Sequence, residues 1–147
     1  QGSPLYVYKF DGYWKDVGTV RSFWQANLDL IDPDNELRIY DDNWRIYTKS
    51  LNLPPHRLGK KAELTDTLVN EACVINGKVN HSVLFSEVEI EEGAEVYNSV
   101  LLNGVKVKSG VKIYNAVVAE NMELTEDIGK ENDEKVYLVS NEGIEEE

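Results

Sequence analysis

Apolar and polar residues follow two different patterns in the first third of the chain. Alternation in "LYVYKF" (Leu5–Phe10) predicts a β-strand, and the short "NWRIYT" (Asn43–Thr48) has a similar strand-like character. Between them, apolar residues recur at helical spacing, which predicts a helix from Val20 to Ile31 with Thr19 as its N-cap. The positions that define this helical face are Val20, Phe23, Trp24, Asn27, Leu28 and Ile31.

The second part of the chain repeats itself every 17 residues. His81–Tyr97 and Asn98–Tyr114 agree at six of seventeen positions when they are laid over each other. A third copy begins at Asn115, and a shorter one, Asp66–Asn80, precedes them. Repeats of this length cannot bury a core alone and are stable only when they stack. The pattern therefore predicts a solenoid.

Each copy divides into three short apolar segments that lie five and six residues apart. This spacing predicts three short parallel strands per turn, each placing one apolar side chain inward, in a hexapeptide-type β-helix of four coils at most. Gly93, Gly104 and Gly110 fall where the corners are expected, and glycine adopts positive φ at little cost. The segment before Pro54 and the tail Lys135–Ile144 are expected to cover the two ends. The predicted inward residues are Val83, Val88 and Ala94, then Val100, Val105 and Val111, then Val117, Met122 and Ile128.

Composition narrows the class of protein. The net charge of −12 argues against a nucleic-acid-binding protein, because phosphate backbones require basic patches. Residues 120–147 hold eleven acidic residues and two lysines, so most of this charge is local. No apolar run is long enough for a membrane span, and the single cysteine, Cys73, is expected to be buried in a protein of the reducing cytoplasm.

One short stretch near the start carries candidate chemistry. "GYWKDVGT" (Gly12–Thr19) places an aromatic residue, a lysine and a carboxylate just before the predicted helix. Taken alone, Asp16 is typical of a turn or capping residue, Trp14 of core packing, and Lys15 of a solvated surface residue. The Pro-containing segment "LNLPPHRLG" (Leu51–Gly59) then marks a boundary, which divides the chain into residues 1–53 and 54–147.

With the motif and the repeat both identified, the chain resembles the C-terminal part of bacterial glucose-1-phosphate adenylyltransferases. The residues that carry the resemblance are "GYWKDVGTVRSFWQANLDLIDPDNEL", "NWRIYT", "LPP", "VNEACVINGKVNHSVLFSEV" and "IGKENDEKVYLVSNEGI", in the order in which they occur in the family. The resemblance implies a mainly β chain, in which a left-handed parallel β-helix follows a short α/β remnant of a nucleotidyltransferase domain. No Gly-rich phosphate loop occurs in the sequence, so the chain is expected to be a fragment that is inactive alone, with the rest of the active site upstream.

The resemblance also implies a reaction and a site. ATP and glucose 1-phosphate would give ADP-glucose and pyrophosphate for glycogen synthesis, with Mg²⁺ neutralising the phosphate charge. Asp16 matches a metal-binding aspartate of the family and is therefore the candidate catalytic, substrate-binding and metal-binding residue. Trp14 matches a position near glucose 1-phosphate. Residues 54–147 would form a regulatory and assembly domain of a homo- or hetero-oligomer, in which a phosphorylated metabolite could bind between the domains.

Three alternatives remain open from the sequence. The chain could be a stand-alone β-helix module for binding or oligomerisation. It could also be a hexapeptide acyltransferase, which would use His81 at a coil corner, whereas His56 has no partner at ligand spacing. A group of basic residues near the boundary is either part of an anionic effector site or ordinary surface: Arg38, Arg45, Lys49, Arg57, Lys60 and Lys61.

Overall fold

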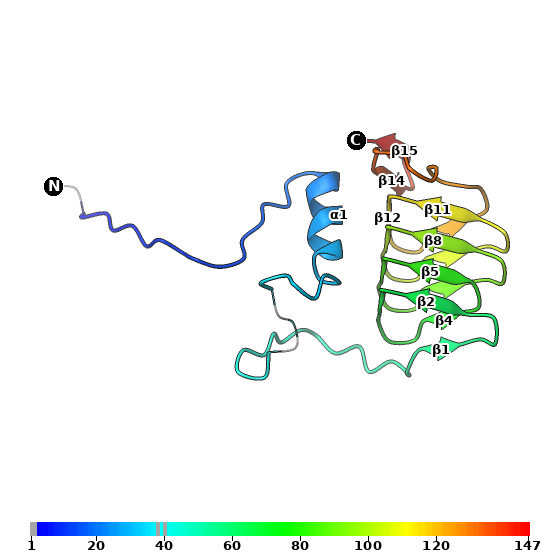
Figure 1. Cartoon of the computed structure of the whole chain (residues 1–147), viewed down its shortest axis with the longest axis horizontal. Helices are drawn as coiled ribbons and strands as arrows, with labels where there is room; N and C mark the ends of the chain where they lie inside the picture. Colours follow the sequence, from blue (N-terminus) through cyan, green and yellow to red (C-terminus); the bar gives the residue numbers. More distant parts are fainter. Residues whose placement is uncertain (1–2, 38, 40) are drawn as a thin grey trace.

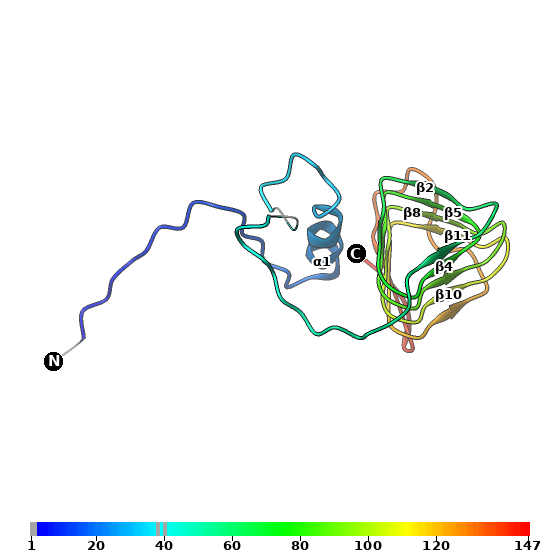
Figure 2. The same ribbon diagram turned by 90° about the horizontal axis from the view of Figure 1, so that it is seen from below.

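The computed structural model describes residues 3–37, 39 and 41–147 of the chain. One helix, α1 (Val20–Leu28), lies beside a column of short strands that are stacked in three sheets (Figure 1). Viewed from below, the column is triangular, and α1 runs along one of its sides (Figure 2). The repeats therefore form the predicted hexapeptide-type parallel β-helix.

Each side of the triangle is one sheet. The first side stacks β1 (Arg57–Leu58), β4 (Val74–Ile75), β7 (Glu89–Ile90), β10 (Lys106–Val107) and β13 (Glu123–Leu124). The second stacks β2 (Glu63–Thr65), β5 (Lys78–Asn80), β8 (Glu95–Tyr97) and β11 (Lys112–Tyr114). The third stacks β3 (Leu68–Val69), β6 (Val83–Leu84), β9 (Val100–Leu101), β12 (Ala116–Val118), β14 (Tyr137–Ser140) and β15 (Gly143–Glu146).

The strand register explains the repeat in the sequence. Val83 pairs with Val100 and Glu95 pairs with Lys112, both at the 17-residue offset. Glu63 pairs with Lys78 at an offset of 15 residues, so the shorter copy is a real coil with a tighter corner. The first and third sheets each stack five parallel strands, so the prediction of four coils at most was wrong by one. Strand β1 lies before the first recognisable copy and β14 after the last one. These two strands account for the additional coil.

The three glycines predicted at the corners have the positive φ expected there. Gly93, Gly104 and Gly110 have φ of 82°, 70° and 79°. At another corner, each coil has a non-glycine residue with positive φ. Two of these residues, Asn98 and Asn115, have φ of 46° and 50°. Asparagine tolerates this region better than other residues with a side chain. Its amides also link the coils, because Asn98 Nδ2 donates to Asn115 Oδ1 over 3.2 Å.

The interior is apolar, but one of the three predicted inward positions was wrong. Val88, Val105 and the residues predicted to point inward from the second side lie in the core. Cys73 is also fully buried, and this burial raises the pKa of its thiol. Val83, Val100 and Val117 instead contribute to a separate cluster with α1 on the outside of the third sheet. The residues beside them, Leu84, Leu101 and Val118, fill the core in their place. Both faces of these strands are apolar, so alternation could not tell inside from outside.

The outer surfaces of the three sheets differ in polarity. On the first and second sheets, charged residues alternate in sign along the column, and the Nζ of Lys112 lies 3.4 Å from a carboxylate oxygen of Glu95. On the third sheet the equivalent outward positions are Leu68, Val83, Val100, Val117 and Leu138. Because helix α1 needs an apolar surface for its own apolar face, it packs on this third sheet.

The two ends of the column differ in how far they are covered by other segments. At the C-terminal end, β15 pairs antiparallel with β14 and completes a hairpin at the edge of the third sheet, as expected for a covering tail. At the other end, the backbone carbonyl of Pro54 accepts a hydrogen bond from the N–H of Ala72. The residues between 43 and 52 remain exposed, so the cover expected from the segment before Pro54 is not formed by them.

The first third of the chain contains less regular structure than predicted. Leu5–Phe10 and Asn43–Thr48 form no strand, since no segment of the described residues pairs with their backbones. The helix ends at Leu28, three residues before the predicted end, and Asp29 is its C-cap. Its start is as predicted: Thr19 is the N-cap and shares a reciprocal capping box with Ser22.

In the part of the chain that the structure describes, no helix has the length and apolar character needed to cross a bilayer.

Candidate functional site

The segment Tyr13–Asp16 precedes α1, and the burial of its side chains alternates between partly buried and exposed. Tyr13 and Lys15 turn toward the C-terminal end of the helix, where both reach the same oxygen of Asp29. The Tyr13 hydroxyl donates over 3.0 Å and the Lys15 ammonium over 2.5 Å. The other Asp29 oxygen accepts from the Gln25 amide over 3.1 Å. The motif is thus fastened to the helix that follows it.

The Asp29 carboxylate is held in its charged form. Burial by itself raises its pKa, but the hydrogen bonds from Lys15, Gln25 and Tyr13 outweigh burial and hold the pKa below its usual value. The same contact and burial raise the pKa of the Tyr13 hydroxyl. Sequence analysis assigned Lys15 to solvent, and this was wrong, because its side chain is 27% exposed and ion-paired. The available signal was a carboxylate at the end of the following helix.

The two predicted site residues are exposed. Trp14 is 76% exposed and Asp16 is also exposed, whereas the neighbouring Tyr13 and Lys15 are partly buried. The core-packing alternative for Trp14 is therefore not realised in this chain. Gly18 lies close to the Asp16 carboxylate, since a Cβ atom at Gly18 would meet Asp16 Oδ1 at 3.5 Å. The motif therefore offers an exposed aromatic ring and an exposed carboxylate.

These residues fit a magnesium ion only as part of a larger site. Among the residues that the structure describes, no three His, Cys, Asp or Glu side chains come together as a metal cluster. Mg²⁺ commonly takes only one or two protein carboxylates, with water and substrate phosphates as its other ligands. Asp16 can supply one such carboxylate, and the remaining ligands would come from outside this motif.

Helix α1 connects the motif to the β-helix. Leu28 is buried on the third sheet, and the Trp24 indole N–H donates to the backbone carbonyl of Asn98 over 2.6 Å. At the other end of the helix, Arg21 contacts Glu147, and its guanidinium also donates to the backbone carbonyl of Glu134. The position of the motif relative to the β-helix is therefore fixed by both polar and apolar contacts.

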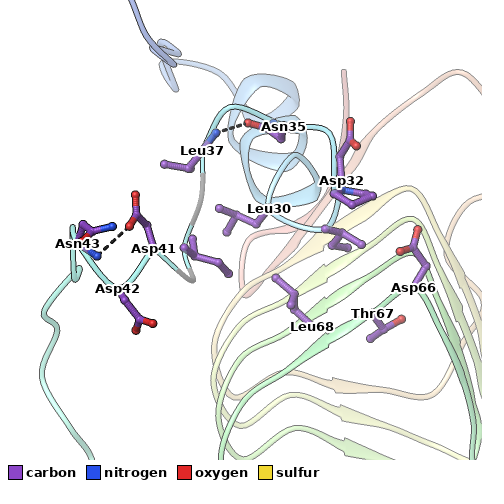
Figure 3. A pocket seen from close by; sticks show the side chains of 13 residues that line it. Leu30, Asp32, Asn35, Leu37, Asp41, Asp42, Asn43, Asp66, Thr67 and Leu68 are labelled. Carbon is purple, nitrogen blue, oxygen red and sulfur yellow. Dashed lines mark hydrogen bonds between the residues drawn. The ribbon is translucent and has the colours of Figure 1, made fainter.

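A large cavity lies apart from the motif. It has a volume of about 920 Å³ and lies between the loop after α1 and the corner that leads into β3 (Figure 3). Four aspartates line it, and two of them, Asp32 and Asp41, accept hydrogen bonds from nearby backbone N–H groups. An acidic lining disfavours phosphate-bearing ligands. Neither Trp14 nor Asp16 is among the described residues that line it.

The two histidines form no catalytic set. His81 lies at a corner with φ of 44°, and its Nδ1 is 2.9 Å from Asp66 Oδ2. It occupies the place of Asn98 and Asn115 in later coils, which indicates a role in the corner. His56 is exposed in the segment before β1.

The basic residues are distributed rather than gathered. Lys60 and Lys61 line a hollow of about 510 Å³ at the tight corner between β4 and β5, where Lys61 pairs with Glu92. Arg45 pairs at 3.9 Å with Asp42, in the segment after α1. Lys49 and Arg57 are exposed and do not line this hollow, and Arg38 lies outside the described residues.

Comparison with known proteins assigns a family to the β-helix. Residues 53–145 match the family described as "GlmU-like, C-terminal hexapeptide". Trp14 and Asp16 lie outside this match.

Curated relatives share about half of the aligned residues. The glucose-1-phosphate adenylyltransferase of Bacillus mycoides (strain KBAB4) is 51% identical over 96 residues, which is 65% of this chain and 26% of the relative. That of Geobacillus stearothermophilus is 54% identical over 91 residues, or 62% and 24%. The chain thus spans about a quarter of the length of the relatives it matches.

Proposed function

The chain belongs to the GlmU-like C-terminal hexapeptide family, and on this premise we propose that it is the C-terminal part of a glucose-1-phosphate adenylyltransferase. The observation that carries the proposal is the identity of 51–54% to relatives of that name over about two thirds of the chain. The proposed reaction transfers an adenylyl group from ATP to glucose 1-phosphate in the cytoplasm, for glycogen synthesis. A sugar-phosphate oxygen attacks the α-phosphorus, and pyrophosphate leaves.

Within this proposal, each residue of the motif has a distinct task. Asp16 holds a Mg²⁺ ion, which neutralises charge on the phosphates and orients them. Trp14 presents its ring to the bound sugar phosphate. Lys15 does not contact phosphate, because its ammonium is engaged by Asp29. The exposure of Trp14 and Asp16, beside the partly buried Tyr13 and Lys15, supports this division.

The division of the chain at residue 53 is part of the same proposal. Residues 1–53 would complete a catalytic domain, and residues 54–147 would be its regulatory and assembly domain. Large apolar side chains are exposed throughout the first part, which supports their burial against further catalytic-domain structure. Apart from the site residue Trp14, they are Leu5, Tyr6, Val7, Tyr8, Phe10, Val17, Trp44, Ile46, Tyr47 and Leu51.

The remaining functional proposals concern partners. The β-helix would join subunits in a homo- or hetero-oligomer. A phosphorylated metabolite would bind near the boundary, where Lys60 and Lys61 face a hollow. The pairing of Lys61 with Glu92 limits the positive charge that this hollow offers, so the effector site needs basic residues from another part of the protein.

One assay separates the proposed function from the alternatives. The full-length protein that contains this chain is incubated with ATP, glucose 1-phosphate and Mg²⁺, and ADP-glucose and pyrophosphate are measured by anion-exchange chromatography. We expect both products in equal amounts. Absence of both would favour the stand-alone binding or oligomerisation module. Release of free thiol from an acyl-CoA by the same protein, lost in His81→Ala, would instead support an acyltransferase.

A further inference from the structure

We propose that Asp29 is a positioning residue that sets the direction of Trp14 and Asp16 through its contacts with Tyr13 and Lys15. This inference rests on the proposed function, because it assigns Asp29 to the Mg²⁺ and sugar-phosphate side of the same site. Asp29 itself contacts neither of the two residues. Its effect passes through their neighbours in the chain.

The contacts of Asp29 fix two alternate residues of one short segment. One carboxylate oxygen accepts from both the Tyr13 hydroxyl and the Lys15 ammonium, at 3.0 and 2.5 Å. Burial alternates along the same segment: Tyr13 and Lys15 are partly buried, whereas Trp14 and Asp16 are exposed. Holding the residues at positions 13 and 15 against the helix therefore leaves those at positions 14 and 16 accessible to a ligand.

The carboxylate is itself held by the helix. Gln25, one turn earlier, donates its side-chain amide to the second oxygen of Asp29 over 3.1 Å. Asp29 is the C-cap of a helix that is docked on the β-helix through the buried Leu28. The chain of contacts thus runs from the rigid column, through the helix, to the exposed site residues.

The chemical character of the contacts suits a positioning role. The side chains of Lys15 and Asp29 are only 27% and 17% exposed, so water competes less with this pair than with a surface ion pair. Charge-assisted hydrogen bonds are stronger and more directional than neutral ones. An exposed motif without secondary structure would otherwise sample many directions, and ordering it in advance lowers the cost of binding a metal and a phosphate.

The test uses single and double substitutions in the full-length protein. The variants are Asp29→Ala, Lys15→Met, their double variant, Lys15→Arg as the conservative replacement, and Asp34→Ala as an exposed carboxylate control. Folding is checked by circular dichroism and thermal melting. Two readouts follow: the Mg²⁺ concentration for half-maximal ADP-glucose synthesis, and direct binding of Mn²⁺ by electron paramagnetic resonance.

We expect Asp29→Ala and Lys15→Met each to weaken metal affinity by about 10- to 100-fold, the usual effect of removing a group that orients a metal ligand. The double variant should be no worse than Asp29→Ala alone, because Asp29→Ala already removes the only contact that Lys15→Met would remove from the pair. Lys15→Arg should retain most of the affinity and Asp34→Ala all of it. Lower melting temperatures with unchanged metal affinity would overturn the inference and leave Asp29 a purely structural residue. Additive losses in the double variant would also overturn it.

Failure of the proposed function gives a different result. If the wild-type protein makes no ADP-glucose, the proposed reaction is rejected, while Mn²⁺ binding still decides the role of Asp29. Tight Mn²⁺ binding that is weakened only by Asp29→Ala and Lys15→Met would keep the positioning inference. Mn²⁺ binding that none of the variants changes would reject it.

Discussion

The guanidinium group of Arg21 donates a hydrogen bond to the backbone carbonyl oxygen of Glu147 over 2.7 Å, across 126 residues of sequence. The same two residues form a second hydrogen bond, in which the backbone N–H of Arg21 donates to the side-chain carboxylate of Glu147 over 2.8 Å. This N–H belongs to the first turn of α1, whose N–H groups have no partner within the helix. Glu147, which directly follows β15, therefore caps and anchors the helix that follows the candidate site.

Substitution of Arg21 should loosen this anchor without unfolding the β-helix. Arg21→Ala removes its side-chain hydrogen bonds, each with a net contribution of about 0.5–1.5 kcal/mol. The loss of two such bonds should speed up amide hydrogen exchange in residues 20–28 by about fivefold to a hundredfold, while exchange in β8 and β11 is unchanged. Mass spectrometry of proteolytic fragments measures both. Equal exchange in α1 of the wild type and the variant would show that the apolar contacts alone hold the helix.

The two apolar clusters should respond independently to truncation. Leu28 lies between α1 and the third sheet, whereas Leu101 lies inside the column. Leu28→Ala should cost about 2–5 kcal/mol of helix docking but leave the melting of the β-helix unchanged. Leu101→Ala should cost a similar free energy and lower that melting temperature. A lower β-helix melting temperature in Leu28→Ala would mean that the helix and the column unfold as one unit.

The tight corner at Gly77 should not tolerate a side chain. A Cβ atom there would lie 2.3 Å from the backbone oxygen of Ala94 and 2.8 Å from that of Glu91, and backbone atoms cannot move aside easily. At Gly59, the nearest atom to an added Cβ belongs to the movable side chain of Asn76. We expect Gly77→Ala to destabilise the β-helix by about 1–3 kcal/mol and Gly59→Ala to destabilise it less. Urea unfolding of both variants measures the difference, and a reversed order would contradict the corner geometry.

The ion pair of Asp29 should make part of the stability depend on pH. The pKa of Asp29 is lower in the folded protein than its ordinary value of 3.8, so its contribution is complete above that value. The contribution is lost as the pH falls through 3.8 and further through the folded-state pKa. We therefore expect the difference in unfolding free energy between wild type and Asp29→Asn to shrink between pH 6 and pH 2.5. A difference that stays constant over this range would show that Asp29 keeps its ordinary pKa.

The architecture of the column was predictable from sequence because the repeat is regular. Copies at a period of 17 residues must stack, and glycines such as Gly93 and Gly110 mark the corners directly. The direction of Val100 was not predictable, because its strand is apolar on both faces and only the position of α1 decides which face is outside. The strand predicted at Leu5–Phe10 failed for a related reason, since strands exist only in pairs.

The candidate site was predictable in part. Asp16 and Trp14 were chosen because the motif resembles that of a family, and their roles stay a prediction. The partnership of Lys15 with Asp29 joins residues 14 positions apart. The sequence shows a carboxylate at the end of the following helix, but only the folded chain shows which side chain pairs with it. The docking of Trp24 on Asn98 is longer in range still, and only the folded chain reveals it.

The central claim is that the Asp16 carboxylate holds the metal ion of an adenylyl transfer. The most direct measurement is turnover of ATP and glucose 1-phosphate by the full-length protein carrying Asp16→Asn, over a titration of Mg²⁺, with Asp34→Asn as the control. Asparagine keeps the size of the side chain and removes its charge. We predict that Asp16→Asn lowers kcat by a factor of about 100 or more while the protein stays folded, and that Asp34→Asn has no effect. Wild-type turnover and wild-type Mg²⁺ dependence in Asp16→Asn would contradict the claim.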